Sequence, residues 1–193
     1  NYYQYLPVHS KPNLSAADID NYVRKSLGYT SIPTSYKHLG AKESMLVDQG
    51  QSFLDVEEVY GTNAALIFAI ALNESNSGRS EFAIERNNLF GLGAFDASPT
   101  DAMKYDSIEK GIETFASVHL NWGFLDYYDS RYNGGHSGDK NSGLNVTYAS
   151  DPYWGEKAAS YYYKLDKYSG LKDYGKETIA IHPTAERMPI RKE

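Results

Sequence analysis

One carboxylate stands where the most apolar segment of the sequence ends. The nine residues Ala64 to Leu72 are all apolar, and Asn73 and Glu74 follow them. A carboxyl group at the exit of a buried helix is partly desolvated, which disfavours its anion and raises its pKa toward the range that a general acid needs. Glu74 is therefore the first candidate for donating a proton to a leaving oxygen. The plain alternative is a solvated glutamate at a helix end.

The sequence lacks the residues that other kinds of catalytic and ligand-binding site need. The sequence has no cysteine, which excludes disulfides, thiolate metal sites and cysteine nucleophiles. No two histidines are paired at i, i+4; the five are His9, His38, His119, His136 and His182. Neither a Gly-x-Ser-x-Gly elbow nor a phosphate-binding Gly-Lys-Ser/Thr loop occurs. We therefore expect no metal and no cofactor, and acid and base catalysis by carboxylates remains.

The length of the chain indicates one domain, and its charge limits the kinds of partner. The 193 residues are enough for one ordinary domain with a core. The 19 Lys and Arg against 25 Asp and Glu give a formal net charge of -6, which argues against nucleic acid as a partner. No apolar run exceeds nine residues, so we expect no membrane insertion. The 18 tyrosines suit sugar rings, although most of them are expected to line half-buried helices.

Hydrophobic spacing and capping residues predict a mainly helical chain. The 63–74 helix is apolar on all sides, as only a buried central helix can be. Ser15 and Asp18 resemble a capping box at the first helix, and Gly50 weakens the second. Trp122 is expected in the core, just before Gly123 interrupts its helix. The expected helices cover residues 16–27, 42–59, 63–74, 80–86, 108–122, 124–131 and 151–170.

Three segments are expected outside the helices. Residues 1–12 contain three tyrosines and two prolines without a period, which indicates an extended arm. Residues 87–96 contain two glycines and are predicted to form a folded-back loop or short strands. The glycine-rich segment 133–145 is predicted to be a mobile surface loop. The predicted fold is thus mainly α, within the α+β class, with a small non-helical or β lobe flanking a cleft.

Four motifs follow one another along the chain. They are Glu74-Ser75 with its small-residue turn to Gly78, Asn88-Leu89-Phe90-Gly91, Tyr105 to Ile112, and Tyr148 to Lys157. Their order and spacing resemble those of bacterial cell-wall N-acetylglucosaminidases of the autolysin type, glycoside hydrolase family 73, in the lysozyme-like superfamily. Tyr5-Leu6-Pro7 and Asn13-Leu14-Ser15 are also similar to the segment before the catalytic core in staphylococcal and clostridial relatives. The resemblance spans roughly residues 1–168 and implies a lysozyme-like helical domain.

The resemblance implies catalytic roles for two residues and leaves a third open. Glu74 corresponds to the family's catalytic acid, and Tyr148 to a tyrosine that faces it across the cleft. Many relatives carry a second glutamate on a hairpin after the Asn-Phe-Gly motif, whereas the short segment from Gly93 to Tyr105 holds Asp96 and Asp101. Asp96 is the candidate base or charge stabiliser, with a turn aspartate as the alternative. Otherwise the N-acetyl group of the substrate acts as the nucleophile, and Tyr148 orients it.

Four further residues are candidates for substrate binding. Asn88 and Phe90 correspond to the cleft floor of the family, with a turn residue and a core ring as the plain alternatives. Tyr153 and Trp154 come just past the helix cap at Asp151, a place that favours surface aromatics able to stack on a sugar.

The implied function is that of a peptidoglycan hydrolase, an autolysin that cleaves the β-1,4 bond after N-acetylglucosamine in glycan strands. A lytic transglycosylase or muramidase of the same superfamily is the alternative among enzymes, and a non-catalytic wall-binding module is the alternative outside them. We expect residues 1–175 to form one catalytic domain, with 1–45 as an N-terminal arm and helix packed on the core. Residues 176–193 are expected to be a tail, either a linker or disordered.

The same resemblance implies the setting of the reaction. We expect a secreted protein at the bacterial cell surface whose partner is the peptidoglycan glycan strand. The chain is expected to be a monomer. Because a net charge of -6 would not attract it to anionic wall polymers, we expect separate wall-binding repeats in a longer chain to target it.

Overall fold

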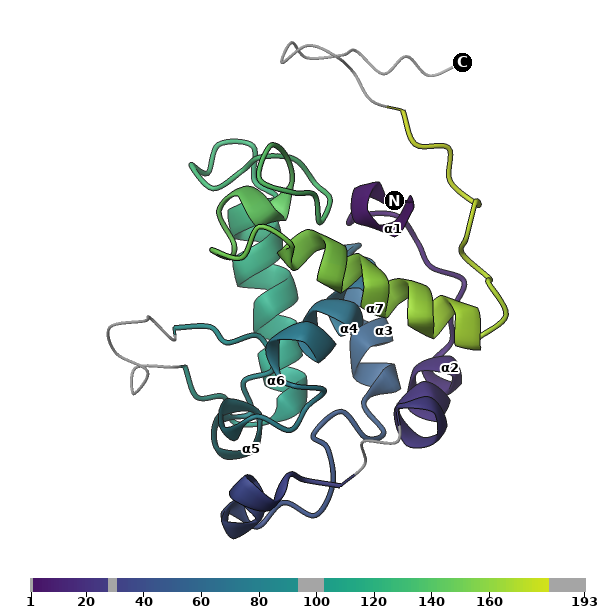
Figure 1. Cartoon of the computed structure of the whole chain (residues 1–193). Coiled ribbons are helices and arrows are strands. Elements are labelled where there is room, and N and C mark those ends of the chain that lie inside the picture. Colours follow the sequence, from purple (N-terminus) through teal and green to yellow (C-terminus); the bar gives the residue numbers. More distant parts are fainter. Residues whose placement is uncertain (1, 28–30, 94–102, 181–193) are drawn as a thin grey trace.

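The computed structural model describes residues 2–27, 31–93 and 103–180 (Figure 1). This part is mainly helical, which confirms the predicted fold class. The helices are α1 (Tyr2–Tyr5), α2 (Ala16–Asn21), η1 (Tyr22–Ser26), η2 (Thr34–Leu39), α3 (Gly50–Tyr60), α4 (Ala64–Glu74), α5 (Glu81–Arg86), α6 (Ile108–Thr114), η4 (Phe115–Phe124), η5 (Leu144–Val146) and α7 (Trp154–Tyr168). Within the described ranges, β pairing is limited to one bridge between Ser31 and Glu43. None of the helices described has the length and apolarity needed to cross a membrane.

Helix α4 is the centre of the core, as its uniform apolarity predicts. Every residue from Ala64 to Leu72 is buried, and each buried leucine or isoleucine side chain contributes about 1.5–3 kcal/mol. The Asn63 side chain caps the helix by accepting a hydrogen bond from the Leu66 amide at 2.9 Å. Helix α7 makes the largest contact with α4 and crosses it in Figure 1, and α3 packs beside it. The C-terminal end of α4 thereby comes to lie under the beginning of α7.

The second predicted helix starts later than its hydrophobic spacing suggested. The helix runs from Gly50 to Tyr60 instead of 42–59, so the glycine expected to weaken it is its first residue. A Cβ atom at Gly50 would lie 2.3 Å from the Ala16 carbonyl oxygen, so the glycine allows α3 to approach α2. The helix expected at 16–27 is confirmed as α2 continued by η1, with Ser15 and Asp18 forming the capping box.

The helix through residues 108–124 differs from the prediction in its period. Its second part, η4, is a π-helix with i→i+5 hydrogen bonds such as that from Leu125 N to Leu120 O at 2.8 Å. Side chains placed by an α-helical period therefore turn away from the core, and Trp122 is 73% exposed. The expectation of a core tryptophan is wrong. The helix also continues through Gly123, and turns replace the second piece expected at 124–131.

The N-terminal segment is more ordered than the predicted extended arm. Residues Tyr2–Tyr5 form the short helix α1, which packs on α7. The buried hydroxyl of Tyr3 donates to the buried carboxylate of Asp166 at 2.6 Å. The arm had no recognisable period because one helical turn is too short to show one, and its tertiary contacts hold it.

The glycine-rich segment 133–145 is irregular, as expected, but it is packed against the domain. The amides of Leu144 and Asn145 donate to the carbonyls of His136 and Ser137, and Asn145 and Ser137 are fully buried. A Cβ atom at Gly138 would lie 1.8 Å from the Ser142 carbonyl oxygen. The glycines thus permit close backbone approaches, which the expectation of a weakly anchored loop did not foresee.

Candidate active site

The Glu74 carboxylate is the last side chain of α4, and two donors converge on one of its oxygens. The Trp154 indole N–H, from the first residue of α7, donates to Oε1. The Asn73 side-chain amide donates to the same oxygen at 3.0 Å. Among the residues that the structure describes, no hydrogen bond to Oε2 is seen. When the carboxyl group is protonated, Oε2 is therefore the oxygen that carries the proton and can donate it.

The turn after Glu74 explains the small residues that follow it. The Ser75 hydroxyl donates to the Ala71 carbonyl, and the Gly78 amide donates to the Ser75 hydroxyl at 2.7 Å. Asn76, Ser77 and Gly78 all have positive φ angles, which ends the helix abruptly. A Cβ atom at Gly78 would lie 2.5 Å from the Ser44 hydroxyl oxygen, so a larger residue would displace the turn. The turn fixes the direction in which Glu74 leaves the helix.

Burial dominates the electrostatics of the Glu74 carboxyl. It raises the pKa of Glu74 above its usual range, and the hydrogen bonds from Trp154 and Asn73 oppose that rise. The charge of Asp151 raises the pKa further. The sequence-based inference that burial at a helix exit raises this pKa agrees with these contacts. A carboxyl group of this kind can hold a proton and release it to a leaving oxygen.

Tyr148, which the resemblance aligns with a tyrosine that faces the acid, lies beside this pair. Its ring is 4.5 Å from that of Trp154 between centroids, and its hydroxyl donates to the Phe90 carbonyl at 3.3 Å. Burial raises the pKa of Tyr148 well above its ordinary value, and the charge of Glu74 acts in the same direction. The hydroxyl therefore stays protonated, so it can donate a hydrogen bond and cannot act as a base.

Trp154 differs from the expectation of a surface aromatic. Its side chain is 2% exposed, because α7 begins at this residue and turns the indole toward the end of α4. The adjacent Tyr153 is 61% exposed and keeps the surface position expected for both residues. Trp154 is thus a hydrogen-bond partner of Glu74 and not a stacking surface.

Asn88 and Phe90 have structural roles, as a turn residue and a core ring. Asn88 is buried and holds its own loop: its amide donates to the carbonyls of Leu92 and Met103, and its oxygen accepts from the amides of Phe90 and Leu92. The Phe90 ring is buried and stacks on Phe115 with centroids 3.8 Å apart. Neither side chain is free to bind substrate, and both support the loop that carries the carbonyl accepting from Tyr148.

Two contributors to the site were missed by sequence reasoning. Asn73 immediately precedes Glu74, and its role as a donor depends on the turn that bends the helix end. Gly91 has a φ of +65°, and a Cβ atom there would lie 3.7 Å from Glu74 Oε2. The glycine in the Asn-Leu-Phe-Gly motif was the available signal. Its missing side chain leaves the proton-bearing oxygen uncovered on that side.

The candidates for a second carboxylate belong to the segment between Gly93 and Tyr105. Asp96 and Asp101 lie outside the described residues. Within the described ranges, no three His, Asp or Glu side chains gather in a way that could hold a metal ion.

A sequence model of one family matches most of the helical core. It is described as "Glucosaminidase: Mannosyl-glycoprotein endo-beta-N-acetylglucosaminidase" and matches residues 50–167, which include Glu74, Tyr148 and Trp154. The chain belongs to this family. The match confirms the family resemblance inferred from the four motifs. Glucosaminidase domains are glycoside hydrolases.

Curated relatives of the glucosaminidase domain occur in Streptococcus pneumoniae. A protein of strain TIGR4 named "Putative endo-beta-N-acetylglucosaminidase" is 40% identical over 136 residues, which cover 70% of this chain and 20% of that protein. The protein of the same name in strain R6 is also 40% identical over 136 residues, which cover 70% of this chain and 18% of that protein. The chain thus spans about a fifth of the length of these curated relatives.

Solved structures share the fold of the glucosaminidase domain. A catalytic mutant of S. aureus autolysin E in complex with the disaccharide NAG-NAM has a TM-score of 0.63 and 22% identity, covering 87% of this chain and 73% of that chain. A structure titled Major Bifunctional Autolysin has a TM-score of 0.56 and 21% identity, covering 87% of this chain and 68% of that chain. These similarities show that this chain has the lysozyme-like helical fold of the autolysin glucosaminidases.

Proposed function

We propose that the domain is a peptidoglycan hydrolase that cleaves the β-1,4 bond after N-acetylglucosamine in glycan strands, with Glu74 as the general acid. The observation that carries this proposal is the asymmetry of the Glu74 carboxyl group. Burial favours the protonated form, and two donors occupy Oε1, so the proton on Oε2 is directed away from the protein donors. The disaccharide in the autolysin E complex supports the choice of substrate.

The other roles of the proposed site follow from the same arrangement. Tyr148 stays protonated and stands by Glu74, so it is proposed to donate a hydrogen bond to the acetamido group of the substrate. Exposed Tyr153 is proposed to stack on a sugar ring. Asp96 remains the alternative to the acetamido group for the step on the far side of the sugar.

The proposed setting is the bacterial cell wall. We propose that residues 1–175 form the catalytic unit, which acts as a monomer outside the cell and is brought to the wall by separate repeats in a longer chain. The net charge of -6 supports separate targeting, because it gives no attraction to anionic wall polymers. The greater length of the curated relatives agrees with additional segments.

Mass spectrometry of digested walls tests the reaction. Purified peptidoglycan is incubated with the domain, reduced, and analysed for the sugar at the new reducing end. N-acetylglucosamine ends support the proposal, and loss of these ends in Glu74→Gln supports the role of the acid. Muramic acid ends would indicate a muramidase, anhydro-muramic ends a lytic transglycosylase, and the absence of release a binding module.

A further inference from the structure

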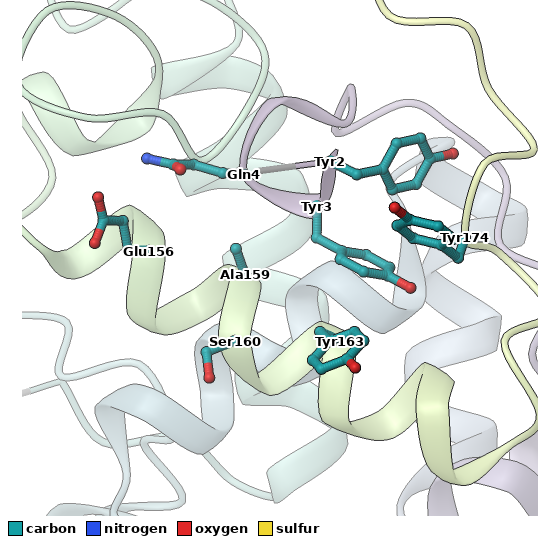
Figure 2. Close-up of a pocket in the computed structure, with 8 residues that line it drawn as sticks. All are labelled: Tyr2, Tyr3, Gln4, Glu156, Ala159, Ser160, Tyr163 and Tyr174. Carbon is teal, nitrogen blue, oxygen red and sulfur yellow. The ribbon is translucent and has the colours of Figure 1, made fainter.

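A tyrosine-rich cavity lies between α1 and α7, away from the proposed acid (Figure 2). Its volume is about 480 Å³, within the range of small-ligand sites. We call it the tyrosine pocket; its lining residues are Tyr2, Tyr3, Gln4, Glu156, Ala159, Ser160, Tyr163 and Tyr174. Trp154 and Glu156 are two positions apart on α7, which places their side chains roughly 200° apart around the helix axis. The pocket is therefore on a different side of α7 from the Glu74 site.

The inner wall of the tyrosine pocket is fixed before any ligand binds. The Tyr3 hydroxyl donates to Asp166, and the Tyr2 hydroxyl donates to the Asp173 carbonyl at 3.1 Å. The Tyr2 ring contacts those of Tyr3 and Tyr174 edge to face, with centroids 5.3 and 5.4 Å apart. A ligand would not have to order these rings on binding, which lowers the entropic cost of association.

The two ends of the tyrosine pocket differ in chemistry. Figure 2 shows the Gln4 amide and the Glu156 carboxylate at one end and the four tyrosine rings at the other. Tyr163 and Tyr174 are 41% and 57% exposed, so parts of their rings remain accessible. The aromatic end suits apolar C–H faces, and the carboxylate at the other end accepts hydrogen bonds from hydroxyl or amide groups.

The two ends of the pocket carry opposite charges, so an anion or a cation that fills the whole pocket meets a like charge at one end. The carboxylate of Glu156 disfavours an anion. The Lys167 ammonium lies 5.7 Å from the centre of the Tyr163 ring, so a cationic ligand on that ring would meet a like charge. A pyranose ring carries no charge, has an apolar face of C–H groups, and presents hydroxyl donors at its edge. It matches both ends of the pocket.

We propose that the tyrosine pocket is a second saccharide-binding site, which holds an uncharged sugar ring of the wall glycan outside the reaction site. The proposal rests on the proposed function for the identity of the substrate. Two contacts to one insoluble polymer raise the effective concentration of cleavable bonds at Glu74 without changing the chemistry there. The pocket then contributes to hydrolysis of walls and not to hydrolysis of short soluble glycans.

Binding is measured with the β-1,4-linked tetramer of N-acetylglucosamine and the Glu74→Gln variant, so that the probe is not cleaved. In NMR titrations we expect shifts of the Ser160, Tyr163 and Tyr174 amides. The affinity for the tetramer, obtained from these shifts, should fall about tenfold when Tyr163→Ala and Tyr174→Ala are combined, since this variant removes two rings that would stack on the sugar. Tyr128→Ala removes an 86% exposed tyrosine that does not line the pocket and serves as the matched control.

Several results would overturn the second site. Shifts confined to residues around Glu74 would show that the tetramer binds only there. Shifts of the pocket amides with tetramethylammonium and not with the tetramer would assign the pocket to a cation. If the double variant does not fold, Glu156→Gln replaces it, because this exposed side chain retains its size and loses only the charge. The tetramer should then bind the pocket more weakly, since a neutral amide oxygen is a weaker acceptor than a carboxylate, and an unchanged affinity would overturn the site.

Hydrolysis separates this proposal from the proposed function. The double variant should digest insoluble walls several-fold more slowly while cleaving soluble glycan fragments at the rate of the unmodified chain. Equal rates on walls would overturn the second site and leave the assignment of Glu74 intact. If instead the unmodified chain releases no N-acetylglucosamine ends from either substrate, the proposed function itself fails, whatever the tetramer binds.

Discussion

The indole nitrogen of Trp154 donates a hydrogen bond to the Glu74 carboxylate, 80 positions earlier in the chain. This contact joins the start of α7 to the end of α4, the pair of helices with the largest contact in the fold. It occupies Oε1 from the protein side and leaves Oε2 for the acid proton. In the proposed reaction, the packing of α7 on the buried helix α4 thus determines which oxygen of the carboxyl group carries the acid proton.

Replacing Glu74 tests the acid directly. Glu74→Gln should slow wall hydrolysis by at least ~100-fold, because a positioned general acid contributes about that much or more. The folded state should remain equally stable, or become more stable, since the variant removes an ionisable group from a desolvated place. Reducing-end release and thermal unfolding are the two measurements. Near-normal hydrolysis with unchanged folding would contradict the assignment.

Removing the indole donor should change the pH dependence of the reaction. A general acid works in its protonated form, so activity falls as the pH rises through its pKa. The Trp154 hydrogen bond lowers the pKa of Glu74, so Trp154→Phe should move this alkaline limb to higher pH. The rate should also fall about 10- to 100-fold because the carboxyl group is less well oriented.

A matched substitution separates this effect from the loss of a tryptophan in general. Trp122→Phe changes the exposed tryptophan of η4 and should leave both the rate and the pH profile unchanged. A purely structural role for Trp154 would lower stability without moving the alkaline limb.

A substitution at Gly91 tests whether the leaving group reaches Glu74 Oε2 past this residue. Gly91→Ala places a methyl group 3.7 Å from that oxygen and strains a backbone with φ of +65°. We expect a loss of about 1–2 kcal/mol in stability from the strain and at least roughly tenfold in kcat, because the methyl group occupies space beside Oε2 that the leaving group needs. Gly61→Ala has almost the same φ, +66°, with nothing within 4 Å, so it should show the strain alone. Equal rates for the two variants would refute a role for Gly91 in access.

Several parts of this fold could be predicted because their signals are local. Uniform apolarity identified α4 as the core, and the Ser15–Asp18 box identified the start of α2. Glu74 could be singled out because its environment depends on the helix that precedes it. These features require only the hydrogen bonding and burial of neighbouring residues.

Other features depend on contacts between distant segments and left no local signal. Trp154 was assigned to the surface because nothing near it in the sequence indicates that α4 ends against it. Gly50 suggested a weak helix, whereas its role is the approach of α3 to Ala16. Trp122 was misplaced because sequence spacing was interpreted with an α-helical period and η4 is a π-helix.

The packed segment 133–145 should be rigid in solution. The amides of Gly138, Gly143, Leu144 and Asn145 donate to backbone carbonyls, so their hydrogen exchange should be slow in the free protein. Gly155→Ala would bring a Cβ atom within 1.9 Å of the Gly138 carbonyl oxygen and should cost roughly 2–3 kcal/mol. Fast exchange at all four amides would instead support the mobile loop predicted from composition.

A control for that substitution lies just beyond the end of α7. Gly170→Ala introduces a methyl group with nothing within 4 Å, at a φ of +95°. It should therefore report backbone strain without a clash. A larger loss of stability in Gly170→Ala than in Gly155→Ala, measured by denaturant unfolding, would contradict the close approach of the segment to α7.

The stereochemistry of the product distinguishes Asp96 from the acetamido group of the substrate. An inverting reaction needs a base with room for a water, with roughly 6.5–9.5 Å between the carboxyl groups, whereas participation by the N-acetyl group retains configuration. We predict participation, because the short segment from Gly93 to Tyr105 has little length to carry a carboxylate across the cleft. The new reducing end should then be β, and Asp96→Asn should cost only a modest part of the rate.

Tyr148 should matter more than Asp96 in this reaction. Its hydroxyl makes a hydrogen bond of 3.3 Å to the Phe90 carbonyl, which an acetamido oxygen bound in the cleft could replace. Donors directed at developing charge are often worth several kcal/mol, so Tyr148→Phe should lower kcat more than Asp96→Asn does. NMR of the first product before mutarotation provides the decisive measurement. An α-configured product would contradict participation and return Asp96, or Asp101 from the same segment of the sequence, to the role of the base.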